Sequence, residues 1–323
     1  MELQNIAMPD PVQDVTHAGL RFFIYATADE MGHASAIQIA REQVQLVEAH
    51  GETSLWLMAA PSAFPFYDAY IELVKVSPML QSALGSTHFF QFDDYPLPAD
   101  HPATFRYLLQ QHLFGKLSRW IPEENIHALN ADAQNLEKTC QAYALDLLTH
   151  GPDLQLKGMG ENGHWGFHEP GVPLDLEPGF MEVDLSDENV AQQMRDHPLL
   201  FTDATEVPVK AVSANVALFM ETHELIEDNV PQESKGFAFL ASYGNEHVND
   251  AVPSSALKQH PNAVVRTTEA AAREWLAYQE HGIVTEGSLS RMVTSLQGES
   301  GGQDMEKYIR STLETMEIPI GAA

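Results

Sequence analysis

The stretch from Gly158 to Gly171, GMGENGHWGFHEPG, holds the densest group of residues suited to acid–base chemistry. His164 has an imidazole that can titrate near neutral pH, and Glu169 is close enough in sequence to orient it. Asn162 could hold the other ring nitrogen. The glycines allow tight turns and a close approach of the backbone to a ligand. Three kinds of site are consistent with this composition: an acid–base site, a phosphate cradle and a metal site.

The phosphate and metal alternatives have weaker support in the sequence. The loop is neither a G-x-x-x-x-G-K-[ST] nucleotide loop nor a G-x-G-x-x-G turn that opens an apolar helix. His164 and His168 are four residues apart and would share one face of a helix, but the glycines and Pro170 argue against a regular helix. No further metal-binding group stands at an obvious spacing from them, so we expect no metal.

The elements around this loop predict where it lies. Asp93 and Asp94 directly follow the apolar run HFFQF, and the loop itself follows DLQLKGMG. Ligands bind beyond the carboxyl ends of the strands in open α/β sheets, so we expect both groups at one edge. The predicted strands are 21–26, 54–60, 88–92, 153–160, 236–242 and 263–268, and the predicted helices are 29–50, 66–84, 102–118, 133–149 and 269–281. This alternation predicts an α/β fold with a Rossmann-like, mostly parallel sheet flanked by helices.

The chain is expected to have three parts. Residues 1–19 form an N-terminal arm, 20–282 a single large α/β domain, and 283–323 a C-terminal extension. Within the extension, GESGG at 298–302 predicts a flexible break. The periodicity of 304–316 predicts one helix that docks on the body or on a partner.

Composition narrows the possible partners and location. The 323 residues include 46 Asp and Glu against 17 Lys and Arg, a net charge of −29 that repels nucleic acid and anionic lipid. Any anion site must therefore be local. No run of 18 apolar residues is present, so we expect no membrane span. The single cysteine, Cys140, and an acidic N-terminus without an apolar segment predict a cytoplasmic protein.

The loop resembles that of the glucosamine-6-phosphate deaminases, which commonly reads G-[IVL]-G-x-[DN]-G-H-I-[AG]-F-N-[DE]-P. The related 6-phosphogluconolactonases share its first part, but this chain continues with F-x-E-P, as the deaminases do. Three further blocks resemble the family in the same order along the chain: 90–114, 125–147 and 252–265. The resemblance covers residues 20–282.

This resemblance implies that glucosamine 6-phosphate is converted to fructose 6-phosphate and ammonia without a cofactor. Asp93 matches the carboxylate that moves a proton between C2 and C1 of the sugar, and His164 matches the histidine that opens the ring. Glu169 matches the acid that orients and tunes this histidine. Asn162 and Asp94 fall at further polar positions of the family site. The loop glycines Gly160 and Gly163 are expected to bring the backbone and the imidazole close to the sugar.

The phosphate contacts implied by the resemblance are only partly retained. Lys235 matches a phosphate-binding lysine, and Arg195 falls within a residue of a phosphate-binding arginine. The family's P-T-G-x-T/S-P loop is replaced by MAAPSAFPFY at 58–67, where Ser62 keeps a hydroxyl but Pro61 has no N–H to donate.

Three substitutions are expected to change the pocket. Trp165 replaces a small aliphatic residue and His168 replaces the usual asparagine, and we expect both to contact the sugar, although core packing is as good an account of Trp165. Lys157 ends its strand where the family has an aliphatic residue, so its side chain is either exposed or directed at the ligand.

Two functions remain open on the sequence. One is an amino-sugar-phosphate deaminase or isomerase, a hydrolase of carbohydrate metabolism, or a related isomerase or lactonase with a changed substrate. The other is a non-catalytic sugar-binding relative. The retained Asp93, His164 and Glu169 favour the enzyme. The implied partner is a small amino-sugar phosphate. A monomer and a homo-oligomer both fit the acidic surface and the added tail.

Overall fold

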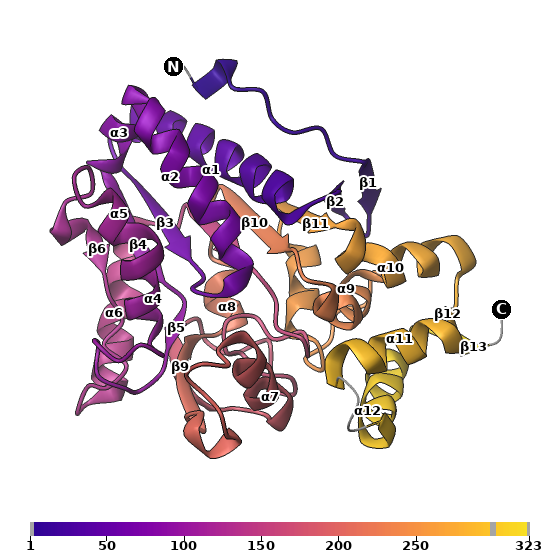
Figure 1. Cartoon of the computed structure of the whole chain (residues 1–323). Coiled ribbons are helices and arrows are strands. Elements are labelled where there is room, and N and C mark those ends of the chain that lie inside the picture. The colour runs from indigo at the N-terminus through magenta and orange to yellow at the C-terminus, as the bar shows by residue number, and fades with distance from the viewer. Residues whose placement is uncertain (1–2, 298–301, 322–323) are drawn as a thin grey trace.

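The central element of a computed structural model of the chain is one eight-stranded sheet (Figure 1). The structure describes residues 3–297 and 302–321. The strand order is β1-β2-β11-β10-β7-β3-β4-β6, and every neighbouring pair is parallel except the hairpin of β1 and β2. The strands are β1 (Gln13–His17), β2 (Leu20–Tyr25), β3 (Thr53–Leu57), β4 (Thr87–Gln91), β6 (Ile126–His127), β7 (Leu154–Lys157), β10 (Leu225–Val230) and β11 (Ala263–Thr268). The predicted mostly parallel α/β fold is confirmed.

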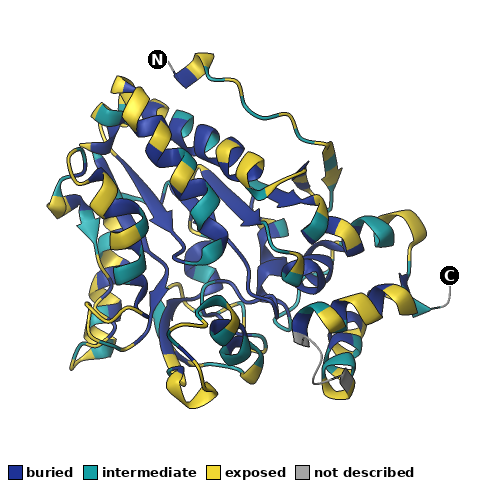
Figure 2. Ribbon diagram, in the orientation of Figure 1, coloured by how far each residue is buried: buried dark blue, intermediate teal, exposed yellow. Residues whose placement is uncertain are grey.

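Helices flank this sheet, with their apolar faces turned inward and their polar faces exposed (Figure 2). The longest, α1, packs on β2, β3, β10 and β11. The helices are α1 (Ala28–His50), α2 (Phe64–Val76), α3 (Pro78–Leu84), α4 (Phe105–Leu109), α5 (Gly115–Leu117), α6 (Leu136–His150), α7 (Asp187–Asp196), α8 (Val216–Phe219), α9 (Gly236–Tyr243), α10 (Glu269–His281), α11 (Glu286–Gln297) and α12 (Gly302–Thr315). Within the described ranges, none is both long and apolar enough to cross a membrane.

Local sequence explains where several helices begin and end. Thr27 and Glu30 form a reciprocal capping box at the start of α1, and Gly51 ends the helix with a φ of 89°. The helix predicted over 66–84 is interrupted between α2 and α3. Pro78 has no N–H and disfavours the helical conformation of Ser77, so the first helix stops there and Ser77 caps the next.

Two elements of the interior differ from expectation. The run at 236–242, predicted as a strand, is helix α9, and each of its residues is buried. A short apolar run fits a buried helix as well as a buried strand, so periodicity could not separate them. The central strand β10 was not predicted, because LIEDNV carries Glu227, Asp228 and Asn229 in its middle. All three are fully buried, and partners from other segments stabilise them.

Both ends of the chain join the body. The N-terminal arm contributes β1, which pairs with β2 along its whole length. The extension forms α11 and α12 where one helix was predicted, and these lie beside α9 and α10 (Figure 1). Tyr308 packs its ring edge-on against Phe237 at 5.7 Å, and Asn245 donates a hydrogen bond to the carbonyl of Met316 at 2.8 Å. The predicted break at 298–302 falls almost wholly on residues outside the described ranges.

Candidate active site

A cavity lies where β3, β4, β7 and β10 end, at the carboxyl edge of the sheet. The space between its lining residues is about 540 Å³, including the open mouth. Five of the predicted site residues line it: Ser62, Asp93, Gly160, His164 and Lys235. The other seven do not: Asp94, Asn162, Gly163, Trp165, His168, Glu169 and Arg195.

Asp93 and Asp94 are separated by the pleat of a second, smaller sheet. They form β5 (Asp93–Asp94), which pairs antiparallel with β9 (Lys210–Ala214), and β9 pairs with β8 (Phe180–Asp184). Successive side chains of a strand point to opposite faces, so only one carboxylate of the pair can face the cavity. That carboxylate is Asp93.

The carboxylate of Asp94 is used for folding. Its Oδ1 accepts hydrogen bonds from the backbone N–H groups of Tyr95 at 2.8 Å and Phe105 at 2.7 Å. Its Oδ2 accepts from Nε of Arg106 at 2.7 Å and from Nε2 of Gln91 at 3.1 Å. The side chain is fully buried and anchors the start of α4. We therefore assign Asp94 to the support of Asp93 and not to substrate contact.

Asp93 has the opposite environment. Within the described part of the chain, its carboxylate accepts no hydrogen bond, and the side chain is almost fully buried. Burial, and then the charge of Asp94, raise the pKa of Asp93 well above its ordinary value. Gly166 leaves room beside it: a Cβ there would lie 3.3 Å from Oδ2 of Asp93, and the backbone has a φ of +60°. This is a carboxylate of raised basicity facing an open cavity.

The backbone around His164 is held by short-range contacts. Its N–H donates to Oδ1 of Asn162 at 3.1 Å, and its carbonyl accepts from the N–H of Gly160 at 3.0 Å and from Oγ of Ser254 at 3.2 Å. Gly163 has a φ of +87° and faces Val252. Val252 and Ser254 belong to the block at 252–265, so that block supports this loop.

The imidazole of His164 lies flat against Gly160. A Cβ on this glycine would come within 2.3 Å of three ring atoms, so any other residue there would displace the imidazole. Burial, and then the positive charges of Lys235 and Lys157, lower the pKa of His164 to about 3. The ring is therefore neutral at physiological pH, whereas the sequence predicted titration near neutrality. Nδ1 is buried without a hydrogen-bond partner in the described part of the chain.

Glu169 is linked by hydrogen bonds to the backbone of His164 and not to its ring. It accepts hydrogen bonds from Nδ2 of Asn162 and Oγ of Ser186, each at 3.0 Å, and from Nδ2 of Asn189. No hydrogen bond joins it to the imidazole. Asn162 instead connects them, since its amide binds Glu169 while its carbonyl oxygen holds the N–H of His164. Burial raises the pKa of Glu169, and its donors oppose that effect. The predicted contact of Asn162 with the ring is a contact with the backbone.

Trp165 and His168 point away from the cavity. The indole of Trp165 stacks on Phe219 with ring centroids 5.1 Å apart, and its Nε1 donates to Gln155 at 3.1 Å. His168 has a partner for each ring nitrogen: the N–H of Val216 at 3.1 Å and the carbonyl of Val172 at 3.0 Å. Because these polar atoms are engaged within the protein, we no longer assign either residue to sugar contact. His168 also has no free nitrogen to share a metal with His164.

Among the described residues that line the cavity, Lys235 is the one lysine or arginine. Lys235, at the end of a short helical turn (Glu233–Lys235), is only 3% exposed, and burial lowers its pKa. Ser62 lies in the turn Pro61–Ala63, and its hydroxyl donates to Oε1 of Gln232 at 2.8 Å. Arg195, in contrast, is 41% exposed and forms an ion pair with Glu161 outside the cavity lining.

One wall of the cavity was not predicted. It comes from the end of α7 and the residue after it, with Gln192, Gln193, Asp196 and His197. Asp196 faces the same space as Lys235 and raises the pKa of that lysine. Nothing in the spacing of this segment relates it to the cavity, because α7 approaches the sheet edge only through the tertiary fold.

The fold and the cavity together define a class of protein. A carboxylate and a neutral imidazole face one space at the carboxyl edge of a parallel sheet, which is the arrangement of an α/β enzyme for proton transfer on a small ligand. Residues 26–166 match the family described as glucosamine-6-phosphate isomerases/6-phosphogluconolactonase.

Individual relatives agree with this match. Glucosamine-6-phosphate deaminase 1 of Giardia intestinalis is 31% identical over 229 residues, covering 70% of this chain and 82% of the relative. Glucosamine-6-phosphate deaminase of Shouchella clausii is 32% identical over 208 residues, covering 64% and 80%. The chain belongs to the glucosamine-6-phosphate isomerase and 6-phosphogluconolactonase family.

Solved structures show the same fold. A monomeric glucosamine-6-phosphate deaminase superposes with a TM-score of 0.66 at 23% identity, covering 78% of this chain and 98% of that one. A 6-phosphogluconolactonase of Thermotoga maritima superposes with a TM-score of 0.59 at 16% identity, covering 76% and 99%. Both cover less than four-fifths of this chain.

Proposed function

We propose that the chain is a glucosamine-6-phosphate deaminase, which converts the amino-sugar phosphate to fructose 6-phosphate and ammonia. The observation that carries the proposal is Asp93, a buried carboxylate of raised pKa, without hydrogen-bond donors, that lines one cavity with the neutral ring of His164. Family membership supports the same reaction, since relatives about 30% identical are named glucosamine-6-phosphate deaminases.

The proposed reaction is a series of proton transfers by His164 and Asp93. His164 is neutral, so it can accept the proton of the sugar O1 and pass it to O5 as the ring opens. Asp93 then takes the proton from C2 while O1 gains a proton from the substrate ammonium, and Asp93 returns its proton to C1, which leaves an iminium at C2. Water adds to that carbon and ammonia leaves, giving the ketose. Each positioned proton transfer contributes a rate factor of roughly 10²–10⁴.

Lys235 and Ser62 are proposed to bind the phosphate. An ammonium in a desolvated cavity interacts strongly with a phosphate, and a hydroxyl adds one donor. Pro61 provides no N–H, so this anion site has fewer donors than a glycine-rich loop would supply. Glu169 and Asn162 are proposed as positioning residues for His164.

The direct test is ammonia release. The purified protein is incubated with glucosamine, galactosamine and mannosamine, each with and without the 6-phosphate, and ammonia is measured. We expect release from glucosamine 6-phosphate, with the free sugar turned over less efficiently. A protein inert toward the whole panel would overturn the proposal. Hydrolysis of 6-phosphogluconolactone, followed by acid release, checks the lactonase alternative.

Partners and location follow from bulk properties. We infer a cytoplasmic enzyme, since the one cysteine is a free, buried thiol. A net charge of −29 disfavours nucleic acid as a partner. Sedimentation at several concentrations distinguishes a monomer from a homo-oligomer.

A further inference from the structure

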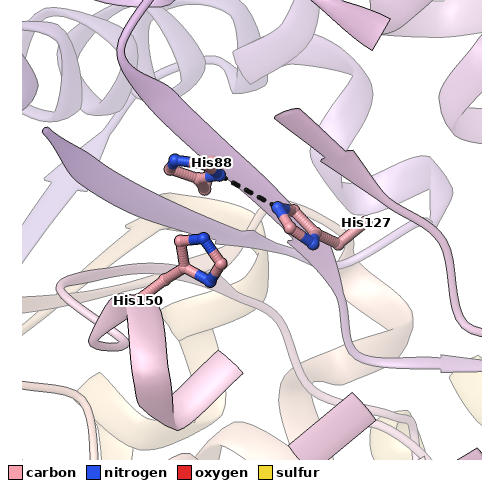
Figure 3. Close-up of side chains that lie close together, drawn as sticks. All are labelled: His88, His127 and His150. Carbon is pink, nitrogen blue, oxygen red and sulfur yellow. Dashed lines mark hydrogen bonds between the residues drawn. The ribbon is translucent and has the colours of Figure 1, made fainter. Parts of the chain in front are cut away.

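Three histidines from separate segments meet at the edge of the sheet farthest from β1 (Figure 3). His88 is the second residue of β4, His127 ends the edge strand β6, and His150 is the last residue of α6. One ring nitrogen from each lies within 4.8 Å of the other two. Their side chains are 17%, 14% and 23% exposed, so the cluster is partly shielded but reachable from solvent.

Hydrogen bonds from Nδ1 fix the tautomer of two of the rings, so that Nε2 of each has a lone pair. Nδ1 of His127 lies 2.6 Å from a carboxylate oxygen of Asp146, so that nitrogen carries the proton and Nε2 has a lone pair. Nδ1 of His150 lies 3.0 Å from the carbonyl of Asp146, which fixes the same tautomer. In Figure 3 the other ring nitrogen of His150, Nε2, is directed toward His88.

The third ring completes the arrangement. Nδ1 of His88 is hydrogen-bonded to Nε2 of His127 at 3.0 Å, and Nδ1 is the donor because Nε2 of His127 has the lone pair. On its other side, Nε2 of His88 lies 3.8 Å from a carboxylate oxygen of Glu52. A cation between these two nitrogens would replace the proton that they share, and His88 would then carry its proton on Nε2, on the side of Glu52.

We propose that His88, His127 and His150 bind a divalent transition-metal cation, with Zn²⁺ as the best fit. Three imidazole nitrogens and a water molecule form a usual tetrahedral set for this ion. Two nitrogens bound at about 2.1 Å to one ion lie no more than about 4.2 Å apart, so small ring rotations from the present positions suffice. Asp146 supplies the carboxylate that commonly orients a ligating histidine.

Charge around the cluster favours a cation. The three histidines are flanked by the carboxylates of Asp146 and Glu52, and the protein as a whole carries a charge of −29. No lysine or arginine within the described residues is ion-paired with either of these two carboxylates. A bound divalent ion would neutralise both.

The position of the three-histidine site, away from the cavity, indicates a structural role. His88 lies near the amino end of β4, whereas Asp93 follows its carboxyl end, about 15 Å away along the strand. The ion would fasten β6, an edge strand of two residues, to β4 and to the end of α6. It therefore stabilises this edge of the sheet and takes no part in the reaction at the cavity.

The test uses the full chain without a polyhistidine tag, stripped with a chelator and titrated with Zn²⁺ in a calorimeter. We expect one ion per chain. His88→Ala and His127→Ala should each weaken binding by about 100-fold or more, and Asp146→Asn by about 10–100-fold. His33→Ala, at an exposed histidine on α1, is the matched control and should bind as the wild type does.

A second measurement keeps the test decisive if one of the alanine variants fails to fold. His150→Gln alters only the last residue of α6, and we expect it to remain folded by circular dichroism. Zn²⁺ should raise the Tm of the wild type and of His33→Ala but not of His150→Gln, because the ion stabilises only the state that binds it. Absence of binding by the wild type, or equal binding by all the variants, would overturn the proposal.

Discussion

Two groups of buried ionisable side chains can be compared, one within strands β7, β10 and β11 and the other in the cavity. Beneath the cavity, Nζ of Lys157 is 3.1 Å from a carboxylate oxygen of Asp228, and Nε of Arg266 is 2.7 Å from one of Glu227. In the cavity, by contrast, the carboxylate of Asp93 has no donor, and Nδ1 of His164 has no partner within the described residues. Both groups are buried, and they differ in ion pairing: each charge of the first group has an opposite charge beside it, although Oδ1 of Asp228 has no hydrogen-bond partner within the described residues.

The difference separates residues that stabilise the fold from residues that act on a ligand. A buried charge without a partner costs free energy of folding and shifts its pKa, whereas a paired one is compensated. Unpaired groups persist where a ligand meets them. Lys157 illustrates this difference in pairing. It is the last residue of β7, next to the loop that carries His164, but its Nζ lies 4.7 Å from the centroid of the Trp165 ring and is ion-paired with Asp228. It is neither exposed nor directed at the ligand.

The largest effect is expected from Asp93→Asn. The substitution removes the base, and ammonia release should fall by at least 10²–10⁴-fold. The fold should become more stable, because ionising Asp93 in the folded state is unfavourable. Since its folded pKa lies above the unfolded value, wild-type stability falls as pH rises through the raised pKa, and the gain in Tm should be largest above it.

Asp100→Asn is the matched control for that variant, since Asp100 is exposed and outside the cavity. It should leave both the rate and the Tm unchanged. A large loss of stability in Asp93→Asn would show that this carboxylate is structural and would remove the contrast between the two groups.

The next effect tests the paired group. Lys157→Met leaves Asp228 buried without its ion-pair partner, and we expect the free energy of unfolding to fall by about 3–5 kcal/mol. Denaturant unfolding measures it. Adding Asp228→Leu should recover part of the loss, because an apolar pair of similar volume avoids the uncompensated charge.

Lys75→Met serves as the reference for Lys157→Met. Lys75 forms an ion pair with Glu72 in which both side chains are more than half exposed, so its loss should cost less than about 1 kcal/mol. Equal losses for the two lysines would contradict the importance of burial.

Lys235→Met tests the phosphate end. We expect KM for glucosamine 6-phosphate to rise by about 10–100-fold with a smaller change in kcat, because a charge-assisted contact contributes about 1.5–3 kcal/mol. Arg195→Gln, outside the cavity lining, should have a smaller effect. If Lys235→Met left KM unchanged, the phosphate assignment would fail.

The smallest effect concerns pH. Asp93 must be ionised to act as the base, so kcat should fall tenfold for each pH unit below its raised pKa. His164, with a pKa of about 3, stays neutral over this range and adds no second limb. The profile is measured as kcat, since the substrate phosphate itself titrates near pH 6. An imidazole of His164 titrating between pH 5 and 8, seen by nitrogen NMR, would contradict this assignment.

Much of the fold could be predicted from the sequence, because apolar strands and amphipathic helices are encoded locally. Prediction of the elements failed where polar residues are buried and where a helix is apolar on every side. β10 has Glu227, Asp228 and Asn229 inside the sheet, and their partners come from β7, β11 and α1. α9 is apolar on all sides, so its sequence carries no helical period.

The site residues, too, could be predicted only in part. Asp93 and His164 were identified from residue type and order, and both line the cavity. Asp94, Trp165 and His168 have comparable chemistry in the sequence, but the structure gives their polar atoms partners within the protein. The wall from α7 and the three-histidine cluster combine segments far apart in the chain, so no spacing indicated them.

The sequence by itself determined the α/β class, the family and the residue types that do the chemistry, because these depend on local periodicity and on motifs within short segments. Only the tertiary structure decided which of those residues face the ligand. A side chain's pKa, its partners and its access to a cavity depend on atoms from distant segments, as the pairing of Lys157 with Asp228 and the isolation of Asp93 demonstrate.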